Sequence, residues 1–184
     1  VDFEGKDIGK WKSKELSKRL AILTQSNNIQ MKLTVRELVT FGRFPYSGNR
    51  VTPEDQKIID RAIHYMELEE FQDRFIDELS GGQRQAVALL MATMTPLRFL
   101  ILDEHTAALD PKTAAKVLAL SDRIVEENGL TTMMVTHNMK DAIVHGNRLI
   151  MMYDGRIVID VSGEEKKKLT VPDLLALFSK VSGS

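Results

Sequence analysis

The first half of the chain carries apolar residues at helical spacing, and polar residues mark where each helix begins. A Ser or Thr followed three residues later by an acid or Gln is the capping-box pattern, and it occurs at Thr34 and Ser80. Thr52 predicts another helix start, with Pro53 in the first turn and a buried stripe of Ile58, Ile59, Ala62, Ile63 and Met66. We expect helices over 34–42, 53–66 and 81–95, and a loop over 43–49.

The second half changes to strands that alternate with helices. Apolar runs predict strands over 98–102 and 130–136, and the polar-capped segments after them predict helices over 111–127 and 138–145. Such alternation predicts a parallel sheet. Asp154-Gly155 predicts a hairpin between strands 149–153 and 156–161, and a last helix follows Thr170.

The N-terminal segment predicts one more strand of this sheet. A turn at Glu4-Gly5 and a short helix after Ser13 come before an apolar run over 20–24. Because this run is apolar on both faces, we expect both faces to be buried. The fold class predicted is therefore α/β, with a core formed by 1–25 and 97–184 and a helical lobe, 26–96, inserted into it.

Composition and charge narrow the class of protein. The chain has 184 residues, 43% hydrophobic and 28% charged, which is typical of a soluble folded domain. Its net charge of -1 gives no general attraction to nucleic acid or an anionic membrane, so anion binding must be local. The absence of Cys excludes disulfides and thiolate sites. The polar start, which lacks an initiator Met, predicts that the sequence begins inside a longer protein.

One candidate phosphate site lies where the helix at Ser80 begins. Gly81 and Gly82 leave the backbone N–H groups unshielded, and a helix N-terminus attracts anions. The alternative is an ordinary capped helix, with Ser80 and Gln83 capping each other. The motif alone leaves both interpretations open.

Polar side chains also follow the predicted strands, where ligands of parallel sheets usually bind. Asp103 and Glu104 end one strand and could hold Mg²⁺ and activate a water molecule, or they could act as helix caps. His137 ends the next strand and could contact a γ-phosphate, or it could cap the following helix. Gln25 ends the first strand and could supply an amide oxygen to the metal, or simply begin a loop.

In this order the motifs resemble the nucleotide-binding domain of ATP-binding cassette (ABC) transporters, over nearly the whole chain. Gln25 matches the Q-loop glutamine, Leu79 to Gln83 the signature motif, and Phe99 to Asp103 the Walker B strand; Glu104 matches the catalytic glutamate, Asp110 ends the D-loop, and His137 matches the switch histidine. The resemblance implies a P-loop NTPase (RecA-like) core, ATP and Mg²⁺ as ligands, and ATP hydrolysis coupled to transport.

The same resemblance implies the roles of the residues and the partners. Glu104 and His137 would be catalytic, Asp103 and Gln25 would bind the metal, and the nucleotide would contact Ser80, Gly81, Gly82, Gln83 and Asp110. The partners would be a second nucleotide-binding domain, bound head to tail, and a membrane permease. The chain would then lie in the cytoplasm, on the inner face of the membrane, touching it only through the permease, and it would not bind nucleic acid.

The sequence departs from the family at the P-loop, G-x-x-x-x-G-K-[ST], which does not occur in these residues. The nearest string, Gly5 to Trp11, has three residues between its glycines instead of four. We therefore expect the first strand, the P-loop and its helix to be missing here, so that a homodimer binds ATP poorly. A partner that carries a P-loop could instead complete one composite site with Ser80 to Gln83, in which Glu104 and His137 stay idle.

Three smaller features complete the expectations. His105 replaces the proline that usually follows the catalytic glutamate, as a subgroup variant or as a pH sensor. Residues 34–48 resemble ATPases of iron–siderophore importers, whereas the segment Asp103 to Thr106 and the tail from Gly163 resemble another importer subgroup, as in a recombined chain. Lys166, Lys167 and Lys168 are predicted to form a solvated run of charge. The function expected is the ATPase subunit of an importer, or alternatively a docking and dimerisation module that does not hydrolyse ATP.

Overall fold

The computed structural model describes residues 1–24, 32–47, 50–66, 68–94 and 96–182 of the chain. By its internal contacts the chain forms two compact units, Val1–Met133 and Met134–Ser184, and the boundary between them falls inside a strand. The predicted division into an α/β core, 1–25 and 97–184, and an inserted helical lobe, 26–96, stays a prediction.

The first unit begins with a small hairpin. β1 (Asp2–Phe3) and β2 (Lys6–Asp7) pair antiparallel, and the turn between them has positive φ at Glu4 (49°) and Gly5 (73°). A 3₁₀ helix, η1 (Ile8–Lys10), and a short helix, α1 (Ser13–Leu16), lead to strand β3 (Leu20–Thr24). The turn, the short helix and the strand are therefore confirmed.

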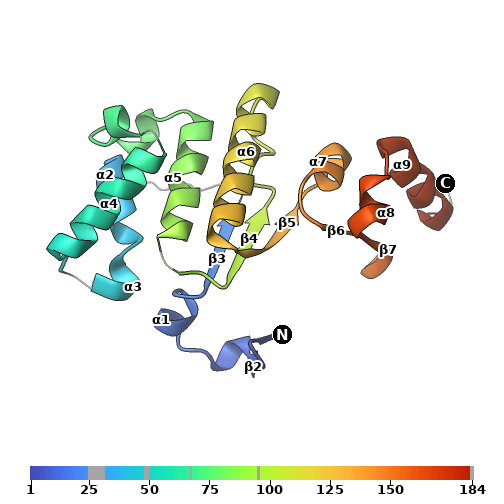
Figure 1. Ribbon diagram of the computed structural model, residues 1–184, viewed down its shortest axis with the longest axis horizontal. Coiled ribbons are helices and arrows are strands. Elements are labelled where there is room, and N and C mark those ends of the chain that lie inside the picture. The colour runs from blue at the N-terminus through green and yellow to red at the C-terminus, as the bar shows by residue number, and fades with distance from the viewer. Residues whose placement is uncertain (25–31, 48–49, 67, 95, 183–184) are drawn as a thin grey trace. The chain divides into compact units, whose positions relative to one another are not determined.

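Three capped helices follow, as predicted (Figure 1). They are α2 (Val35–Phe41), α4 (Pro53–Tyr65) and α5 (Gly81–Thr93), and a reciprocal capping box begins each of them, at Thr34, Thr52 and Ser80. Short 3₁₀ helices η2 (Glu69–Phe71) and η3 (Ile76–Glu78) connect α4 to α5. The apolar stripes of these helices face one another, and Val35, Val39, Ile59 and Val87 are fully buried there.

The loop predicted over 43–49 is wrong for its first part, which forms a short helix, α3 (Phe44–Ser47). The carbonyl oxygen of Arg43 accepts hydrogen bonds from the N–H of Tyr46 (2.9 Å), the N–H of Ser47 (2.9 Å) and the hydroxyl of Ser47 (3.0 Å). The residue types predict a loop here, but a proline in the first turn of a helix loses no hydrogen bond.

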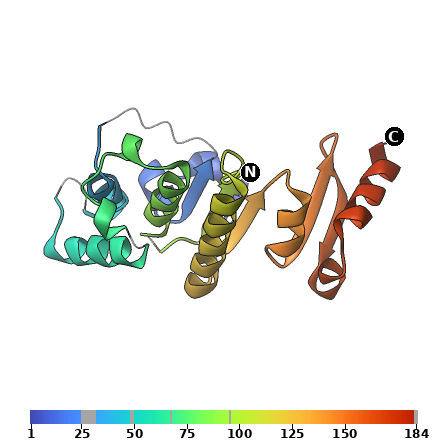
Figure 2. The same ribbon diagram turned by 90° about the horizontal axis from the view of Figure 1, so that it is seen from above.

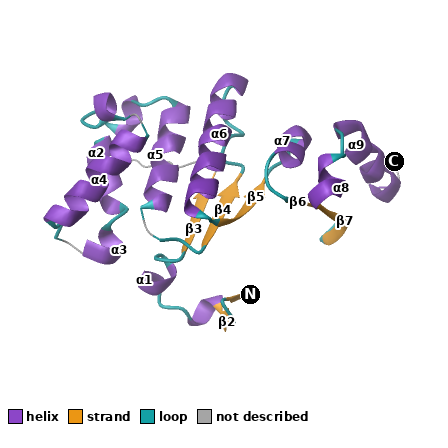
Figure 3. Ribbon diagram, in the orientation of Figure 1, coloured by secondary structure: helices purple, strands orange, loops and turns teal. Residues whose placement is uncertain are grey.

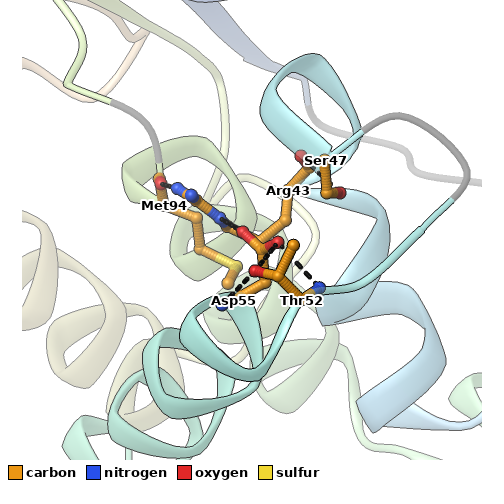
Figure 4. A network of polar contacts seen from close by, with 5 residues as sticks. All are labelled: Arg43, Ser47, Thr52, Asp55 and Met94. Carbon is orange, nitrogen blue, oxygen red and sulfur yellow. Dashed lines mark hydrogen bonds and ion pairs between the residues drawn. The ribbon is translucent and has the colours of Figure 1, made fainter.

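Arg43 also ties α4 to the end of α5 (Figure 4). Its guanidinium donates to the carboxylate of Asp55 at 2.9 Å and to the carbonyl oxygen of Met94 at 3.0 Å. Asp55 in turn accepts from the N–H of Thr52 (3.1 Å) and from its hydroxyl (2.7 Å). These bonds satisfy a buried pair of charges, which would otherwise be costly in this position.

The central sheet has the strand order β3, β4 (Phe99–Asp103), β5 (Thr131–Val135), as Figure 3 shows. β3 and β4 are parallel and in register from Leu20 opposite Phe99 to Thr24 opposite Asp103, so their carboxyl ends meet at one edge. The long helix α6 (Pro111–Asn128) follows β4 and ends at Gly129 with φ +57°. The predicted parallel sheet is confirmed.

The prediction that β3 is buried on both faces is wrong. Leu23, Leu100 and Leu102 are buried on the face that α5 covers, but Ile22 is 58% exposed on the other face. Figures 1 and 2 show α5 and α6 beside the strands of the first unit. The run of apolar residues did reflect a strand, but in the described part of the chain the helices cover one face of it.

The second unit begins with the end of β5 and continues with α7 (Met139–Val144). β6 (Arg148–Tyr153) and β7 (Arg156–Ser162) form the predicted antiparallel hairpin, with φ of 47° at Asp154 and 73° at Gly155. α8 (Gly163–Lys167) and α9 (Val171–Ser182) complete the unit. A small core holds it together, formed by Leu149, Ile159 and Leu174.

Lys166 contradicts the prediction of a solvated lysine run. It is 3% exposed, and its ammonium donates to the carbonyl oxygens of His145 (3.0 Å) and Gly146 (3.1 Å) and to that of Ile143. Burial lowers the pKa of Lys166. The lysine therefore caps the C-terminal end of α7 from inside the unit, where cations are favoured. Lys167 and Lys168 are exposed, as predicted.

No helix in the described ranges is long and apolar enough to cross a membrane.

Candidate functional site

The first part of the candidate site is the start of α5. The hydroxyl of Ser80 accepts from the N–H of Gln83 at 3.3 Å, and the side-chain oxygen of Gln83 accepts from the N–H of Ser80 at 2.9 Å. Both side chains therefore cap the helix. Among the residues that the structure describes, no acceptor bonds to the N–H of Gly81 or Gly82. Those two donors remain at the end of a 13-residue helix, and they point along its axis.

The two glycines are also needed for packing inside the chain. A Cβ built on Gly82 would lie 2.2 Å from the methyl group of Thr113, in the first turn of α6, and a Cβ on Gly81 would lie 3.0 Å from the side chain of Leu109. Gly82 is buried at this contact, whereas Gly81 is half-buried. The glycines therefore let α5 pack against α6, and neither N–H group donates a hydrogen bond within the described residues.

This contact joins the signature turn to the segment that resembles the D-loop. Asp110 is the N-cap of α6, and its carboxylate accepts from the N–H of Lys112 and of Thr113, each at 3.1 Å. The bonds to Thr113 hold the pKa of Asp110 below its usual range. Asp110 was predicted to contact nucleotide, and in this structure its side chain caps a helix, which leaves the nucleotide contact a prediction.

The second part of the candidate site is the end of β4. Asp103 is its last residue, exposed and opposite Thr24 of β3, and no hydrogen bond or ion pair of its side chain occurs within the described chain. Glu104 follows with φ +47°, a conformation that favours glycine. Such backbone strain occurs more often at functional positions than elsewhere.

Magnesium would fit this strand end only if phosphate oxygens and water supplied the remaining ligands. Among the described residues no group of three or more His, Asp or Glu side chains could hold a metal ion. Proteins usually bind Mg²⁺ through one or two carboxylates, with phosphate oxygens and water as the remaining ligands. The carboxylate of Asp103 fits that role, since it is exposed and unengaged.

His105 has a structural place. Its ring is 2% exposed, and its Nε2 lies 3.2 Å from the hydroxyl of Ser121 in α6. Because that hydroxyl already donates to the carbonyl oxygen of Val117 at 2.9 Å, it accepts from His105, whose Nε2 therefore carries a proton. The ring fills the space between the loop after β4 and α6.

Two predicted residues are not placed relative to this strand end. His137 follows β5 and belongs to the second unit, where it is exposed, and the helix after it is capped by Asn138, whose side chain accepts from the N–H of Lys140 at 3.0 Å. Gln25 lies outside the described residues, directly after Thr24. The structure thus brings the ends of β3 and β4 together, and it packs the signature turn against α6.

The packing roles of Thr113 and Leu109 were missed by the sequence interpretation. Both residues contact the glycines of α5 through apolar atoms, the methyl group of Thr113 and the side chain of Leu109. Sequence spacing alone does not show which residue touches which glycine.

Comparison with known proteins identifies the class. Residues 1–107 match the ABC transporter family. The chain is 40% identical over 171 residues to the petrobactin import ATP-binding protein YclP of Bacillus subtilis (strain 168), covering 93% of this chain and 68% of that protein. The chain therefore belongs to the ABC transporter family, and its α/β architecture is that of the family's ATPases.

Two further comparisons agree with this assignment. A tyrosine transport ATP-binding protein of Clostridioides difficile (strain R20291) is 49% identical over 113 residues, which cover 61% of this chain and 45% of that protein. The solved structure of cbiO1 from Clostridium perfringens, part of the ABC transporter complex cbiONQ, superimposes with a TM-score of 0.76 at 26% identity. The superposition covers 97% of this chain and 70% of the cbiO1 chain.

Proposed function

We propose that this chain is part of the ATP-binding and ATP-hydrolysing subunit of an importer. The observation that carries the proposal is the start of α5, where two backbone donors stay unengaged although every side chain of the capping box is used. The family to which the chain belongs is the second support. ATP is the ligand that this family implies.

The proposed roles follow from the position of each residue. The N–H groups of Gly81 and Gly82 bind phosphate oxygens of an ATP molecule that the P-loop of a second domain holds. In the chain's own nucleotide site, at the ends of its strands, Asp103 and Gln25 hold Mg²⁺, and Glu104 takes the proton of the attacking water. His137 contacts the γ-phosphate, and Asp110 lies at the interface between the two domains.

The solute and the partners are inferred from relatives. Several proteins similar to this chain are named as importers of iron carriers, among them petrobactin import proteins and the iron(3+)-hydroxamate import protein FhuC of Bacillus subtilis (strain 168). We infer that this chain serves iron–siderophore import, at the inner face of the cell membrane, with a permease and a second nucleotide-binding domain as partners.

One observation favours a second candidate function. The 184 residues contain no P-loop pattern, so the strand-end acids have no element in this sequence that would keep a nucleotide within reach. In that case the chain would act as a docking and dimerisation module, completing a partner's site through its signature turn without hydrolysing ATP itself.

Phosphate release separates the two candidates. The chain is assayed alone and mixed with an ATP-binding subunit of the family that carries a P-loop. Release that vanishes in the Glu104→Gln variant supports the enzyme. Release by the mixture that vanishes in Ser80→Arg but survives Glu104→Gln supports one composite site with idle acids. A stable complex without added release supports the docking module.

A control variant tests whether such losses come from damaged helix capping. Thr170 begins α9 with the same reciprocal bonds, to the N–H and side chain of Asp173, and lies outside the proposed site. Thr170→Arg should leave phosphate release unchanged. If it lowers release as much as Ser80→Arg does, the signature turn has no special role.

A further inference from the structure

A basic pocket lies at the opposite edge of the central sheet from Asp103 and Glu104. It has a volume of about 430 Å³ and is lined by Lys18, Arg19, Tyr46, Pro96, Leu97 and Arg98. Arg98 directly precedes β4, whereas Asp103 ends this five-residue strand, so about 15 Å of strand separates the pocket from the candidate nucleotide site. The two sites are therefore distinct.

The backbone holds two of the cationic residues next to each other. The N–H groups of Arg98 and Phe99 both donate to the carbonyl oxygen of Arg19, at 2.8 and 3.0 Å. Because these bonds open the parallel pairing of β3 and β4, the two arginines begin adjacent strands. Their proximity follows from the sheet itself and costs electrostatic energy that an anion would offset.

The positive charge in the pocket is only partly compensated. Arg19 forms an ion pair with Glu4, but within the described part of the chain neither Lys18 nor Arg98 pairs with an acid. Instead the ammonium of Lys18 lies 4.6 Å from the ring centre of Tyr46. A cation over an aromatic ring keeps its charge available to a second, anionic partner.

The surrounding segment strengthens this charge. Residues 6–19 hold six cationic side chains and two acidic ones, although the whole chain has a net charge of -1. A concave surface lined by one sign of charge concentrates the field and attracts small counter-ions. Lysine with arginine is a common combination for phosphate groups, since arginine can donate two parallel hydrogen bonds.

We propose that this pocket, the Lys18–Arg98 pocket, binds a phosphate-bearing ligand. The phosphate comes either from a soluble di- or polyphosphate or from the headgroup of an anionic phospholipid. The proposal does not rest on the ATPase function, because its ligand needs no adenosine and no signature turn.

Calorimetric titration of the full chain with inorganic pyrophosphate, at about 50 mM ionic strength, tests the proposal. Co-sedimentation with phosphatidylcholine vesicles that contain phosphatidic acid tests the lipid source. We expect saturable binding in at least one arm, with a Kd below about 1 mM for pyrophosphate, and a loss of at least about tenfold in the Lys18→Gln, Arg98→Gln double variant. The arm that shows this loss identifies the source.

The matched control removes two exposed cations elsewhere in the first unit, Lys57→Gln with Lys116→Gln. It should bind within about twofold of the parent, since only screened long-range charge changes. Urea unfolding of each variant checks that the chain is folded. If the double variant is unstable, the single variants Lys18→Gln and Arg98→Gln replace it. No binding in either arm, or an equal loss in the control, overturns the proposal.

Discussion

The start of α5 and the end of β4 are the two stretches that carry the functional interpretation, and the chain uses them differently. At the start of α5 the side chains of Ser80 and Gln83 cap the helix, and Gly82 fits against Thr113. At the end of β4, Asp103 makes no described contact with its side chain, and Glu104 takes a strained backbone conformation. The first stretch is therefore maintained by stability as well as by function, whereas the side chain of Asp103 adds no hydrogen bond to the described fold.

The largest effect on stability is expected at Gly82. An added methyl group would collide with Thr113, which costs about 3 kcal/mol, offset by about 1 kcal/mol from the better helix propensity of alanine. Gly82→Ala should therefore lower the free energy of unfolding by about 2 kcal/mol, measured by urea denaturation.

The Thr113→Ala substitution supplies the control for this contact. The double variant should recover most of the loss, because the methyl group that collides is gone. If Gly82→Ala is destabilising to the same extent with and without Thr113, the glycine is not required for packing.

Lys166 extends the comparison to the second unit, since it too is a polar residue with its bonds completed inside the chain. Lys166→Met should lower the free energy of unfolding by about 1.5 kcal/mol, because carbonyl oxygens at the end of α7 lose their donor. Hydrogen exchange of the α7 amides would show the loss locally. The exposed neighbours Lys167→Met and Lys168→Met should change stability by less than about 0.5 kcal/mol, and equal effects at all three positions would contradict the capping role.

At Glu104, in contrast to Gly82, glycine should be the more stable residue. Glycine adopts positive φ without strain, so Glu104→Gly should be more stable than Glu104→Ala by about 1 kcal/mol, although both remove the carboxylate. Thermal unfolding of the two variants checks this. A glycine variant that is less stable than the alanine variant would mean that the loop after β4 is not strained in solution.

The smallest expected effect is the acid sensitivity of Asp110. Its pKa is lowered in the folded chain, so its charge stabilises the fold above the unfolded pKa of about 4, and this contribution is lost as the pH falls through the lower, folded pKa. Asp110→Asn keeps a capping side chain but does not titrate. The stability difference between the parent and this variant should shrink from pH 6 to pH 3, and a difference that is constant with pH would contradict the assignment.

Local signals predicted much of the fold. The capping patterns at Thr34, Thr52 and Ser80, and the turn at Asp154-Gly155, all depend on residues within a few positions of one another, and the structure has each of them. The helix at Phe44 was missed because proline was taken as a loop residue.

Contacts between distant segments could not be predicted in this way. Lys166 looks like part of a charged run, and only the fold brings it to carbonyl groups about 20 residues earlier. The collision partner of Gly82 lies on another helix, and the burial of His105 depends on Ser121. For the candidate site, sequence identified the chemical groups, while the reason for two glycines required the packing of α5 against α6.

The central claim is that the start of α5 completes a nucleotide site whose P-loop belongs to another domain. The direct test is the binding of a fluorescent ATP analogue to a mixture of this chain with an ATP-binding subunit of the family that carries a P-loop. We expect at least about tenfold tighter binding than to either chain alone, lost in Ser80→Arg and retained in Glu104→Gln. Sub-millimolar binding by the isolated chain, or full enhancement by the Ser80→Arg variant, would contradict it.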